Sequence, residues 1–257
     1  MALLEVSGLC LSFGGVQAVQ ALDFCVERGG VHSIIGPNGA GKTSVFNLVT
    51  GLYRPTAGRI VFEGTEVTGR RPHELAWLGM SRTFQNLQIC FNMSAVENVM
   101  VGAHLRLEQG LLRALLRPPS QVRADRTCRD EALRLIGFVG LSRFARLDAE
   151  SMPYGALKRL EIARALAARP KLLLLDEPAA GLNPTEMREI DGLIQRIAAT
   201  GVTVVLVEHD MKLVMGLSDH IVVLDHGRKL AEGTAAEVRK DPAVIAAYLG
   251  AAAASPP

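Results

Sequence analysis

The chain has 257 residues, 49% of them hydrophobic and 21% charged, so it is long enough to bury a large core. Its formal net charge of +2 gives no reason to expect a nucleic acid or a strongly anionic surface as a partner. The four cysteines are spaced too irregularly for a metal knuckle. No apolar run approaches the roughly 20 residues of a transmembrane helix, so any association with a membrane has to come through a partner.

The two ends of the chain carry weak signals. Met1 to Glu5 show neither the basic flank nor the apolar core of a signal peptide, so we expect the protein not to be secreted. Residues 251–257 have no polar pattern and no helix cap, and we expect a flexible tail there.

The hydrophobic pattern divides the rest into three parts. Up to about Glu66 it is rich in strands, and it predicts strands at 3–9, 21–26, 31–35 and 59–63 with one helix at 43–49. Between 94 and 168 the period changes to 3.6, which predicts an inserted helical segment. Its expected apolar faces carry Leu105, Leu111, Leu112, Leu115 and Leu116, then Ala132, Leu133, Leu135 and Ile136.

From Lys171 onward, strands and helices alternate, which favours a mostly parallel sheet. The expected elements are strands at 172–175, 202–207 and 221–224 and helices at 185–199 and 211–217.

A phosphate-binding pattern, GxxxxGK[ST], follows the apolar strand at 31–35 and opens the helix at 43–49. In it, backbone N–H groups turn toward the phosphates, Lys42 reaches the β and γ oxygens, and the Thr43 hydroxyl is placed for Mg²⁺. The positive end of the helix also faces the anion. The residues expected to bind the nucleoside triphosphate here are Gly36, Asn38, Gly39, Ala40, Gly41, Lys42, Thr43 and Ser44.

Two carboxylates, Asp176 and Glu177, follow the buried strand at 172–175. Ligands of open α/β sheets bind at this end of the strands. We expect Asp176 to hold Mg²⁺ through water and Glu177, turned the other way, to polarise the attacking water. Alone, the pair is equally compatible with a strand-end turn, but the phosphate loop earlier in the chain favours the catalytic interpretation.

The order of motifs resembles the nucleotide-binding subunits of ATP-binding cassette (ABC) transporters over about Leu3 to Gly250. Gln85 stands in a segment like the Q-loop, where it would contact Mg²⁺ and couple to the membrane partner. His209 stands in place of the switch histidine, and Phe13 in place of the aromatic residue that stacks on adenine. Singly, these three residues also suit ordinary surface, structural or core roles; their joint order favours the family.

A signature motif in this family lies at Pro153, Tyr154, Gly155 and Ala156, and it acts on ATP bound to the opposite subunit. The resemblance therefore implies that two cassettes sandwich two ATP molecules. This sequence departs from the pattern, because Pro153 replaces the usual Ser and Ala156 the usual Gln. Asn183 likewise stands where many members have Asp. Pro is tolerated at the first helical position, so we expect the helix to form but the composite site to be weaker.

The resemblance also implies a fold: a P-loop α/β core with a mostly parallel sheet, an antiparallel β subdomain and an inserted helical subdomain. We expect one ATPase domain over 1–250, with the core and β subdomain in 1–93 and 169–250 and the helical subdomain in 94–168.

Three stretches narrow the resemblance to ATPase subunits of branched-chain amino-acid importers, at 178–184, 208–215 and 247–250. Such a subunit would pair with a second ABC ATPase, in a homodimer or heterodimer, on the cytoplasmic face of the inner membrane. There it would dock on two permeases, while a periplasmic solute-binding protein selects the solute. Relatives for urea or amide uptake and for lipid export share much of the pattern and stay open as alternatives.

Other classes fit the sequence less well. A soluble cassette of translation would need two cassettes, and one of DNA repair would need a long coiled coil between the phosphate loop and the signature. A small-molecule phosphotransferase has no use for Gln85, His209 and the signature together. A non-catalytic binding subunit is disfavoured by Glu177.

Overall fold

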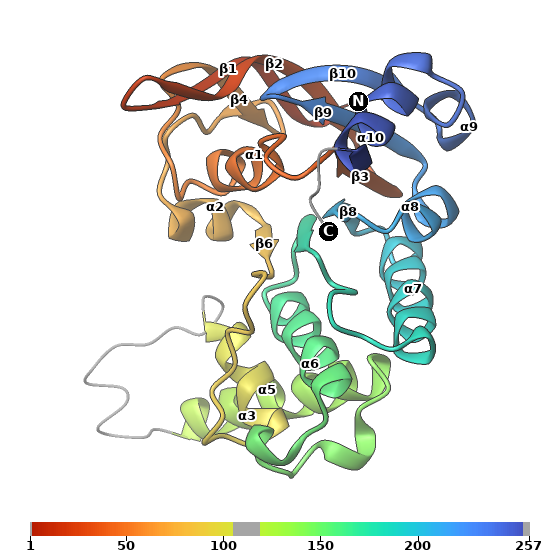
Figure 1. Ribbon diagram of the computed structural model, residues 1–257. Coiled ribbons are helices and arrows are strands. Elements are labelled where there is room, and N and C mark those ends of the chain that lie inside the picture. The colour runs from red at the N-terminus through yellow and green to blue at the C-terminus, as the bar shows by residue number, and fades with distance from the viewer. Residues whose placement is uncertain (1, 105–118, 254–257) are drawn as a thin grey trace.

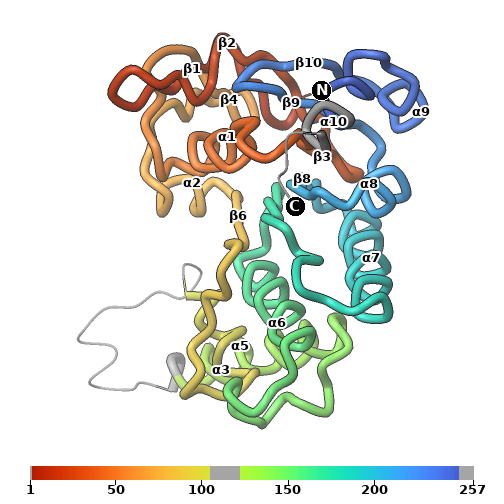
Figure 2. The backbone as a smooth tube through the Cα atoms, in the orientation of Figure 1, coloured from red at the N-terminus to blue at the C-terminus, as the bar shows by residue number. Residues whose placement is uncertain are grey.

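A computed structural model describes residues 2–104 and 119–253, and it places two β-sheets above a group of helices (Figure 1). One sheet has four strands in the order β2-β1-β4-β5, and the other has six in the order β10-β9-β3-β8-β7-β6. In Figure 2 the backbone runs from β6 down into the helical group, and after α6 it returns to the larger sheet, where it forms β7. The helical group is therefore an insertion between two strands of the larger sheet.

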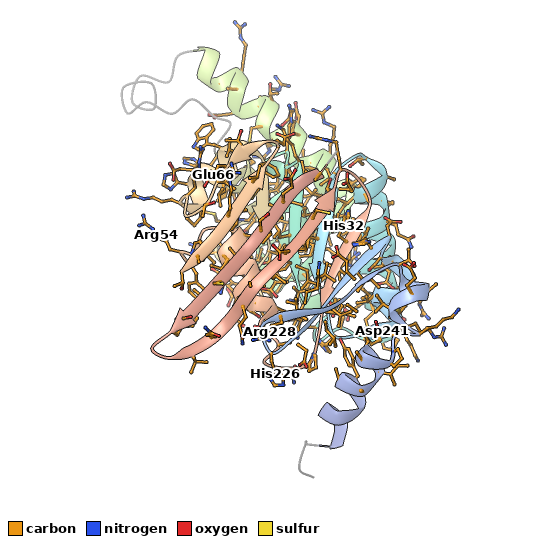
Figure 3. The ribbon with its side chains drawn as sticks, turned by 90° about the horizontal axis from the view of Figure 1, so that it is seen from above. His32, Arg54, Glu66, His226, Arg228 and Asp241 are labelled. Atoms are coloured by element: carbon orange, nitrogen blue, oxygen red, sulfur yellow. The ribbon has the colours of Figure 1, made fainter. Side chains whose placement is uncertain are left out.

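The smaller sheet is antiparallel. It contains β1 (Ala2–Phe13), β2 (Val16–Glu27), β4 (Ala57–Phe62) and β5 (Thr65–Glu66). The first two pair along their whole length to form a long hairpin, with Phe13 opposite Val16 next to the turn. Seen from above, β1 and β2 run side by side across the top of the molecule (Figure 3). Both are longer than predicted, because residues on both faces are exposed next to the turn, Phe13 and Val16 included, which hides the alternation.

The larger sheet is parallel except for one edge strand. Its strands are β3 (Val31–Ile35), β6 (Met80–Arg82), β7 (Leu172–Asp176), β8 (Thr203–Val207), β9 (His220–Asp225) and β10 (Arg228–Gly233). Only β10 pairs antiparallel, with β9. Every residue of β3, β7 and β8 is buried, as expected for strands covered on both faces.

The two faces of the larger sheet contribute to separate cores. Leu172 and Leu174 point to the core shared with the antiparallel sheet and with Phe46 of α1 (Lys42–Val49). Leu173 and Leu175 point to the opposite core, which α7 (Pro184–Ala199) and α8 (Met211–Leu217) cover. Alternation along one strand thus fixes the sheet between two packed layers, with the ends of its strands free to carry a site.

The helical group consists mainly of α3 (Ala95–Gly102), α5 (Pro119–Phe138) and α6 (Tyr154–Ala167). A Cβ at Gly102 would collide with the carbonyl oxygen of Arg164, so α3 and α6 can approach this closely only with glycine there.

One part of the predicted helix pattern is wrong and another is untested. The buried stripe of α5 follows Cys128, Ala132 and Ile136 at intervals of four residues, whereas Leu133 is 40% exposed because it lies about 100° away around the helix. The predicted apolar positions Leu105, Leu111, Leu112, Leu115 and Leu116 lie outside the described residues.

Several short elements had no sequence signal: α2 (Pro72–Leu78), β5, β6, β10, α9 (Ala235–Val238) and α10 (Pro242–Ala253). Most are too short or too polar to show a period, whereas α10 is apolar on all sides and so shows no amphipathic stripe. The expected tail at 251–257 starts too early, because α10 continues to Ala253 as an alanine-rich helix. Within the described ranges, no helix combines the length and apolarity required to cross a membrane.

Candidate functional site

A cavity of about 500 Å³ opens beside the phosphate loop. Residues 38–44 line it together with Glu177, four residues of β2 and the β9–β10 turn at His226 and Gly227. His226 lies at the exposed end of that turn (Figure 3). Segments from four distant parts of the chain therefore meet around one hollow, and the loop and one of the two predicted carboxylates share it.

The conformation of the phosphate loop depends on glycine at two positions. Gly36 has φ 154°, and a Cβ there would collide with the carbonyl oxygen of Leu224. At Gly41, with φ 99°, a Cβ would lie 2.7 Å from the Ala18 carbonyl oxygen. The backbone thus fills the space that side chains would need, which leaves a cradle lined by peptide groups.

The N-terminus of α1 is open toward this cavity. Its N-cap, Gly41, makes no side-chain hydrogen bond, and its first turn holds no acidic residue. By contrast, Ser94, Asn183 and Asp210 cap α3, α7 and α8 with their side chains. The first N–H groups of a helix need an acceptor, and the helix dipole favours a negative one, so this end of α1 suits a phosphate.

Lys42 is buried within the loop, 8% exposed. Its Nζ donates to the carbonyl oxygens of Gly36 at 2.8 Å and Pro37 at 2.9 Å. Burial lowers the pKa of Lys42, while the nearby carboxylates of Glu177 and Asp176 act in the opposite direction. The ammonium group therefore lies close to both acids predicted from the sequence.

Asp176 and Glu177 diverge at the end of β7, as alternation predicts. Asp176 is 3% exposed, and its Oδ2 accepts a hydrogen bond of 2.8 Å from Arg82. Glu177 adopts φ 47° and lines the cavity, and its Oε2 accepts from Nε2 of Gln85 at 3.2 Å. The structure thus brings Gln85, Glu177 and the phosphate loop together, with Asp176 directly behind them.

His209 follows β8, the neighbour of β7 in the sheet, and its side chain is 61% exposed. The residue before it, Glu208, is buried and accepts the backbone N–H groups of Ala179 at 3.0 Å and His209 at 3.2 Å. Burial raises the pKa of Glu208. This carboxylate therefore joins the His209 segment to the segment that follows Glu177.

The predicted signature lies at the start of α6, and the cavity lining does not include it. Pro153 is the N-cap with an extended backbone, φ −60° and ψ 152°, so the prediction of Pro at the first helical position is wrong by one residue. Its carbonyl oxygen accepts the N–H of Ala156 at 2.9 Å. Tyr154 is 45% exposed, and the side chain of Glu186 occupies the space beside Gly155 where a Cβ would stand.

Phe13 lies at the end of β1, 49% exposed, with its ring edge-on to Tyr53 at 5.4 Å between centroids. The cavity lining includes Val16, across the hairpin turn, but not Phe13. Phe13, His209 and the signature are thus predicted site residues that do not line this cavity.

Sequence reasoning assigned no role to Arg82, Glu161 or Glu208. Glu161 on α6 is buried, and its Oε1 accepts the N–H groups of Phe84 at 3.3 Å and Gln88 at 3.4 Å, which ties the segment around Gln85 to the helical group. Glu161 and Glu208 stand in or next to an apolar run, whereas Arg82 stands among mixed residues. Because charged side chains are almost never fully buried without partners, that apolar context is the signal that could have revealed the two glutamates.

A phosphate loop and strand-end carboxylates around one cavity, on a mostly parallel sheet, define a P-loop nucleoside triphosphatase. A family profile described as "ABC transporter" matches residues 19–180, and one described as "Branched-chain amino acid ATP-binding cassette transporter" matches residues 228–254. The chain belongs to the ABC transporter family, as an ATP-hydrolysing cassette. This confirms the family and the fold class predicted from the sequence.

Similar proteins cover nearly the whole chain. The high-affinity branched-chain amino acid transport ATP-binding protein BraF of Pseudomonas aeruginosa is 48% identical over 251 residues, which covers 97% of this chain and 98% of that protein. LivG of Escherichia coli strain K12, which has the same description, is 44% identical over the same shares. A crystal structure of a nucleotide-free ATP-binding cassette from an ABC transporter superposes with a TM-score of 0.84 at 30% identity, covering 96% of this chain and 99% of that one.

Proposed function

We propose that the chain is the ATP-hydrolysing subunit of an importer for branched-chain or other hydrophobic amino acids. The observation that carries the proposal is the similarity to BraF and LivG over 97% of this chain, together with the cavity that joins the phosphate loop to Glu177. The profile match at 228–254 supports the branched-chain subgroup in a part of the chain outside the ATPase motifs.

The site residues have separate tasks in this proposal. Residues 36–44 hold the phosphates through backbone N–H groups, and Lys42 leaves its carbonyl partners to reach the β and γ oxygens. Glu177, whose carboxylate lines the cavity, polarises the attacking water. His209 contacts the γ-phosphate from the neighbouring strand, and Phe13 stacks on adenine.

Mg²⁺ fits the donor set, because a hydroxyl, an amide oxygen and a carboxylate are oxygen ligands of the kind that it takes beside substrate phosphates. Thr43, Gln85 and Asp176 would hold it. When bound, it neutralises charge that develops on the phosphate oxygens. Asp176 directly precedes Glu177 in the chain, and Gln85 donates a hydrogen bond to Glu177, which supports one shared site.

A second cassette completes the site in our proposal. The N-terminus of α6 has no side-chain cap and carries exposed Tyr154, yet it lies away from this chain's own phosphate loop. Donors at such a terminus stabilise the γ-phosphate only when another chain brings its phosphate loop to them. ATP binding then closes the pair, and hydrolysis reopens it.

We place the cassette on the cytoplasmic face of the inner membrane, bound to two permeases that receive solute from a periplasmic binding protein. A cleft of about 310 Å³ between α2, β6 and the helices α3 and α6 suits a permease segment, because it adjoins the segment that carries Gln85. Over 1–250 the chain forms one ATPase domain, with 94–168 as its helical subdomain. Uptake of urea or amides, lipid export, or a soluble role are the alternatives.

Affinity purification of the tagged chain from detergent-solubilised membranes tests the proposal. We expect two permeases and a sibling ATPase to co-purify, and the reconstituted complex to hydrolyse ATP faster when its binding protein carries leucine, isoleucine or valine. The matched control is the complex with Glu177→Gln, which should assemble without turnover. If urea or short amides stimulated hydrolysis instead, the proposed solute would be wrong and the transport role would stand. If the tagged chain purified without any membrane protein, the transport role would be overturned.

A further inference from the structure

Arg82, the last residue of β6, holds a position that the phosphate-loop chemistry does not explain. Its side chain is 8% exposed, and Nη2 donates to Oδ2 of Asp176 at 2.8 Å. Nη1 donates to Oδ1 of Asn47 at 2.6 Å and to Oγ1 of Thr50 at 3.0 Å. Asn47 belongs to α1, and Thr50 is its C-cap. One guanidinium thus joins Asp176 to the helix that the phosphate loop opens.

Two aromatic rings flank the same guanidinium. Its Cζ lies 5.6 Å from the centroid of Phe46 and 5.0 Å from that of Phe84. Phe46 is fully buried in the core, whereas Phe84 is 37% exposed. The rings hold the planar group between a fixed side and a side that meets solvent, which a lysine in this place could not reproduce.

The solvent side is the cleft between the sheet and the helical group. Thr50, Arg82 and Phe84 all line it, so they share a wall with any segment that enters. Gln85, next to Phe84 in the chain, donates to Glu177. Two pairs of contacting residues therefore connect the cleft to the nucleotide cavity. One pair is Arg82 with Asp176, and the other is Gln85 with Glu177.

We propose that Arg82 is a positioning residue for Asp176 and that it transmits the state of the cleft to the nucleotide site. Displacement of Phe84 by an occupant of the cleft shifts the guanidinium, which in turn moves the Asp176 carboxylate relative to α1. The inference rests on the proposed function in two respects, the role of Asp176 as a ligand of Mg²⁺ and a permease segment as the occupant of the cleft. It adds a route to the nucleotide site that does not pass through Gln85.

Equilibrium binding of a fluorescent ATP analogue to the purified full chain tests the positioning role, with Mg²⁺ and with EDTA. For Arg82→Met we expect the affinity for the analogue with Mg²⁺ to fall about tenfold, which is the low end of the losses seen when a residue that orients a metal ligand is removed. The affinity in EDTA should stay within about twofold of that of the parent. The affinity of Arg82→Lys with Mg²⁺ should lie between those of the parent and the methionine variant, because lysine keeps the positive charge but lacks the planar set of N–H donors. Arg59→Met is the control for loss of one positive charge, since Arg59 pairs with Glu66 at the surface, and it should change neither affinity.

A purely structural role would give a different pattern. It would lower the melting temperature and weaken both affinities in parallel, and that result would overturn the proposal. Should Arg82→Met not fold, Arg82→Lys and Asn47→Ala carry the test, because Asn47→Ala removes one of the two hydrogen bonds from Arg82 to α1 and its C-cap and leaves the bond to Asp176 in place. Unchanged Mg²⁺ dependence in both would also overturn it.

A double-mutant cycle that combines Phe84→Ala with Arg82→Met tests whether the cleft acts on the nucleotide site through Arg82. Phe84→Ala should weaken Mg²⁺-dependent binding about threefold in the parent and have no further effect in Arg82→Met, because residues coupled through a shared contact are not additive. Additive effects would contradict the route. If the parent chain itself bound the analogue without any dependence on Mg²⁺, the proposed nucleotide site would be wrong. If the parent showed that dependence and the Arg82 variants kept it unchanged, only the role of Arg82 would be wrong.

Discussion

Two helices of this cassette, α1 and α6, begin without a side-chain cap, and the difference between their surroundings supports the proposal that each chain contributes to two composite sites. The N-terminus of α1 lies in a cavity with Lys42 and Glu177 of the same chain. At α6, the N-cap is Pro153, Tyr154 is exposed, and the nearest side chain beside Gly155 is the acidic Glu186. Both ends offer donors to an anion, but at α1 a cavity of the same chain also brings the Lys42 ammonium and the Glu177 carboxylate to them.

In our proposal the chemistry is therefore concentrated at α1, and α6 contributes donors to a phosphate held by another chain. Substitutions at α1 should therefore act on binding and chemistry within one chain. Substitutions at α6 should act only after two cassettes assemble.

The largest effect is expected at the phosphate loop. Lys42→Ala removes the ammonium group that the loop holds close to Glu177 and Asp176, so ATP binding should be lost or nearly so. Isothermal titration of the purified variant with Mg-ATP measures this. Its melting temperature serves as the folding control, and a folded variant with parental affinity would show that the loop does not grip the triphosphate through this residue.

Glu177→Gln separates binding from chemistry at the same site. The amide keeps the size of the side chain but cannot act as a base, so turnover should fall by about 10²–10⁴ while ATP affinity is retained. Chains trapped with ATP should elute as a closed dimer in size-exclusion chromatography. Hydrolysis at the parental rate would mean that the catalytic base is a different residue.

A smaller effect is expected at α6. Pro153→Ser restores a hydroxyl and a backbone N–H at the N-cap, and ATPase activity of the assembled complex should rise severalfold. Pro153→Ala is the matched control, because it restores the N–H without the hydroxyl. Unchanged or reduced turnover of the serine variant would contradict the interpretation of a weakened signature.

The smallest effect concerns Glu161, which ties the Gln85 segment to α6. Burial raises its pKa in the folded protein above the ordinary value of about 4.3, so the folded state binds its proton more tightly than the unfolded state. Its contribution to stability is fully present below the ordinary value and is lost as pH rises through the raised pKa. Glu161→Gln has no such proton to lose.

The difference in melting temperature between the parent and Glu161→Gln should therefore shift in favour of the variant as pH increases across that window. A change of 1 kcal/mol corresponds to roughly 2–4 °C for a domain of this size. Thermal scans from acidic to neutral pH measure it, and a constant difference would show that the carboxyl titrates alike in both states.

Local pattern was enough to predict the features that depend on it. The strand at Val31–Ile35 and the helix at Met211–Leu217 begin and end where the sequence predicts, because each has a clear apolar pattern between turn residues. The phosphate loop can be recognised from the sequence because its backbone conformation requires glycine at defined positions. The outer ends of the β1–β2 hairpin and the edge strand β10 are held by backbone pairing with the neighbouring strand, and their partly exposed side chains show no clear hydrophobic period.

Side-chain partnerships at the site were the least predictable part. Arg82 and Asp176 are far apart in sequence, and only the parallel pairing of β6 with β7 brings their strands together. Glu208 likewise gains its backbone partner at Ala179 only because β7 and β8 are neighbours. The apolar run before Glu208 signals that this charge needs a partner, whereas the sheet order decides which partners both Arg82 and Glu208 find.

Enzyme-concentration dependence of ATP hydrolysis tests the central claim most directly, which is that a second cassette completes the pocket around the γ-phosphate. Specific activity should be measured over at least a hundredfold range of chain concentration, with the molar mass determined by light scattering in the same samples. We predict that activity per chain increases with concentration in step with the dimer fraction, and that an added sibling cassette increases it further. Full specific activity in a preparation that stays strictly monomeric would contradict the account.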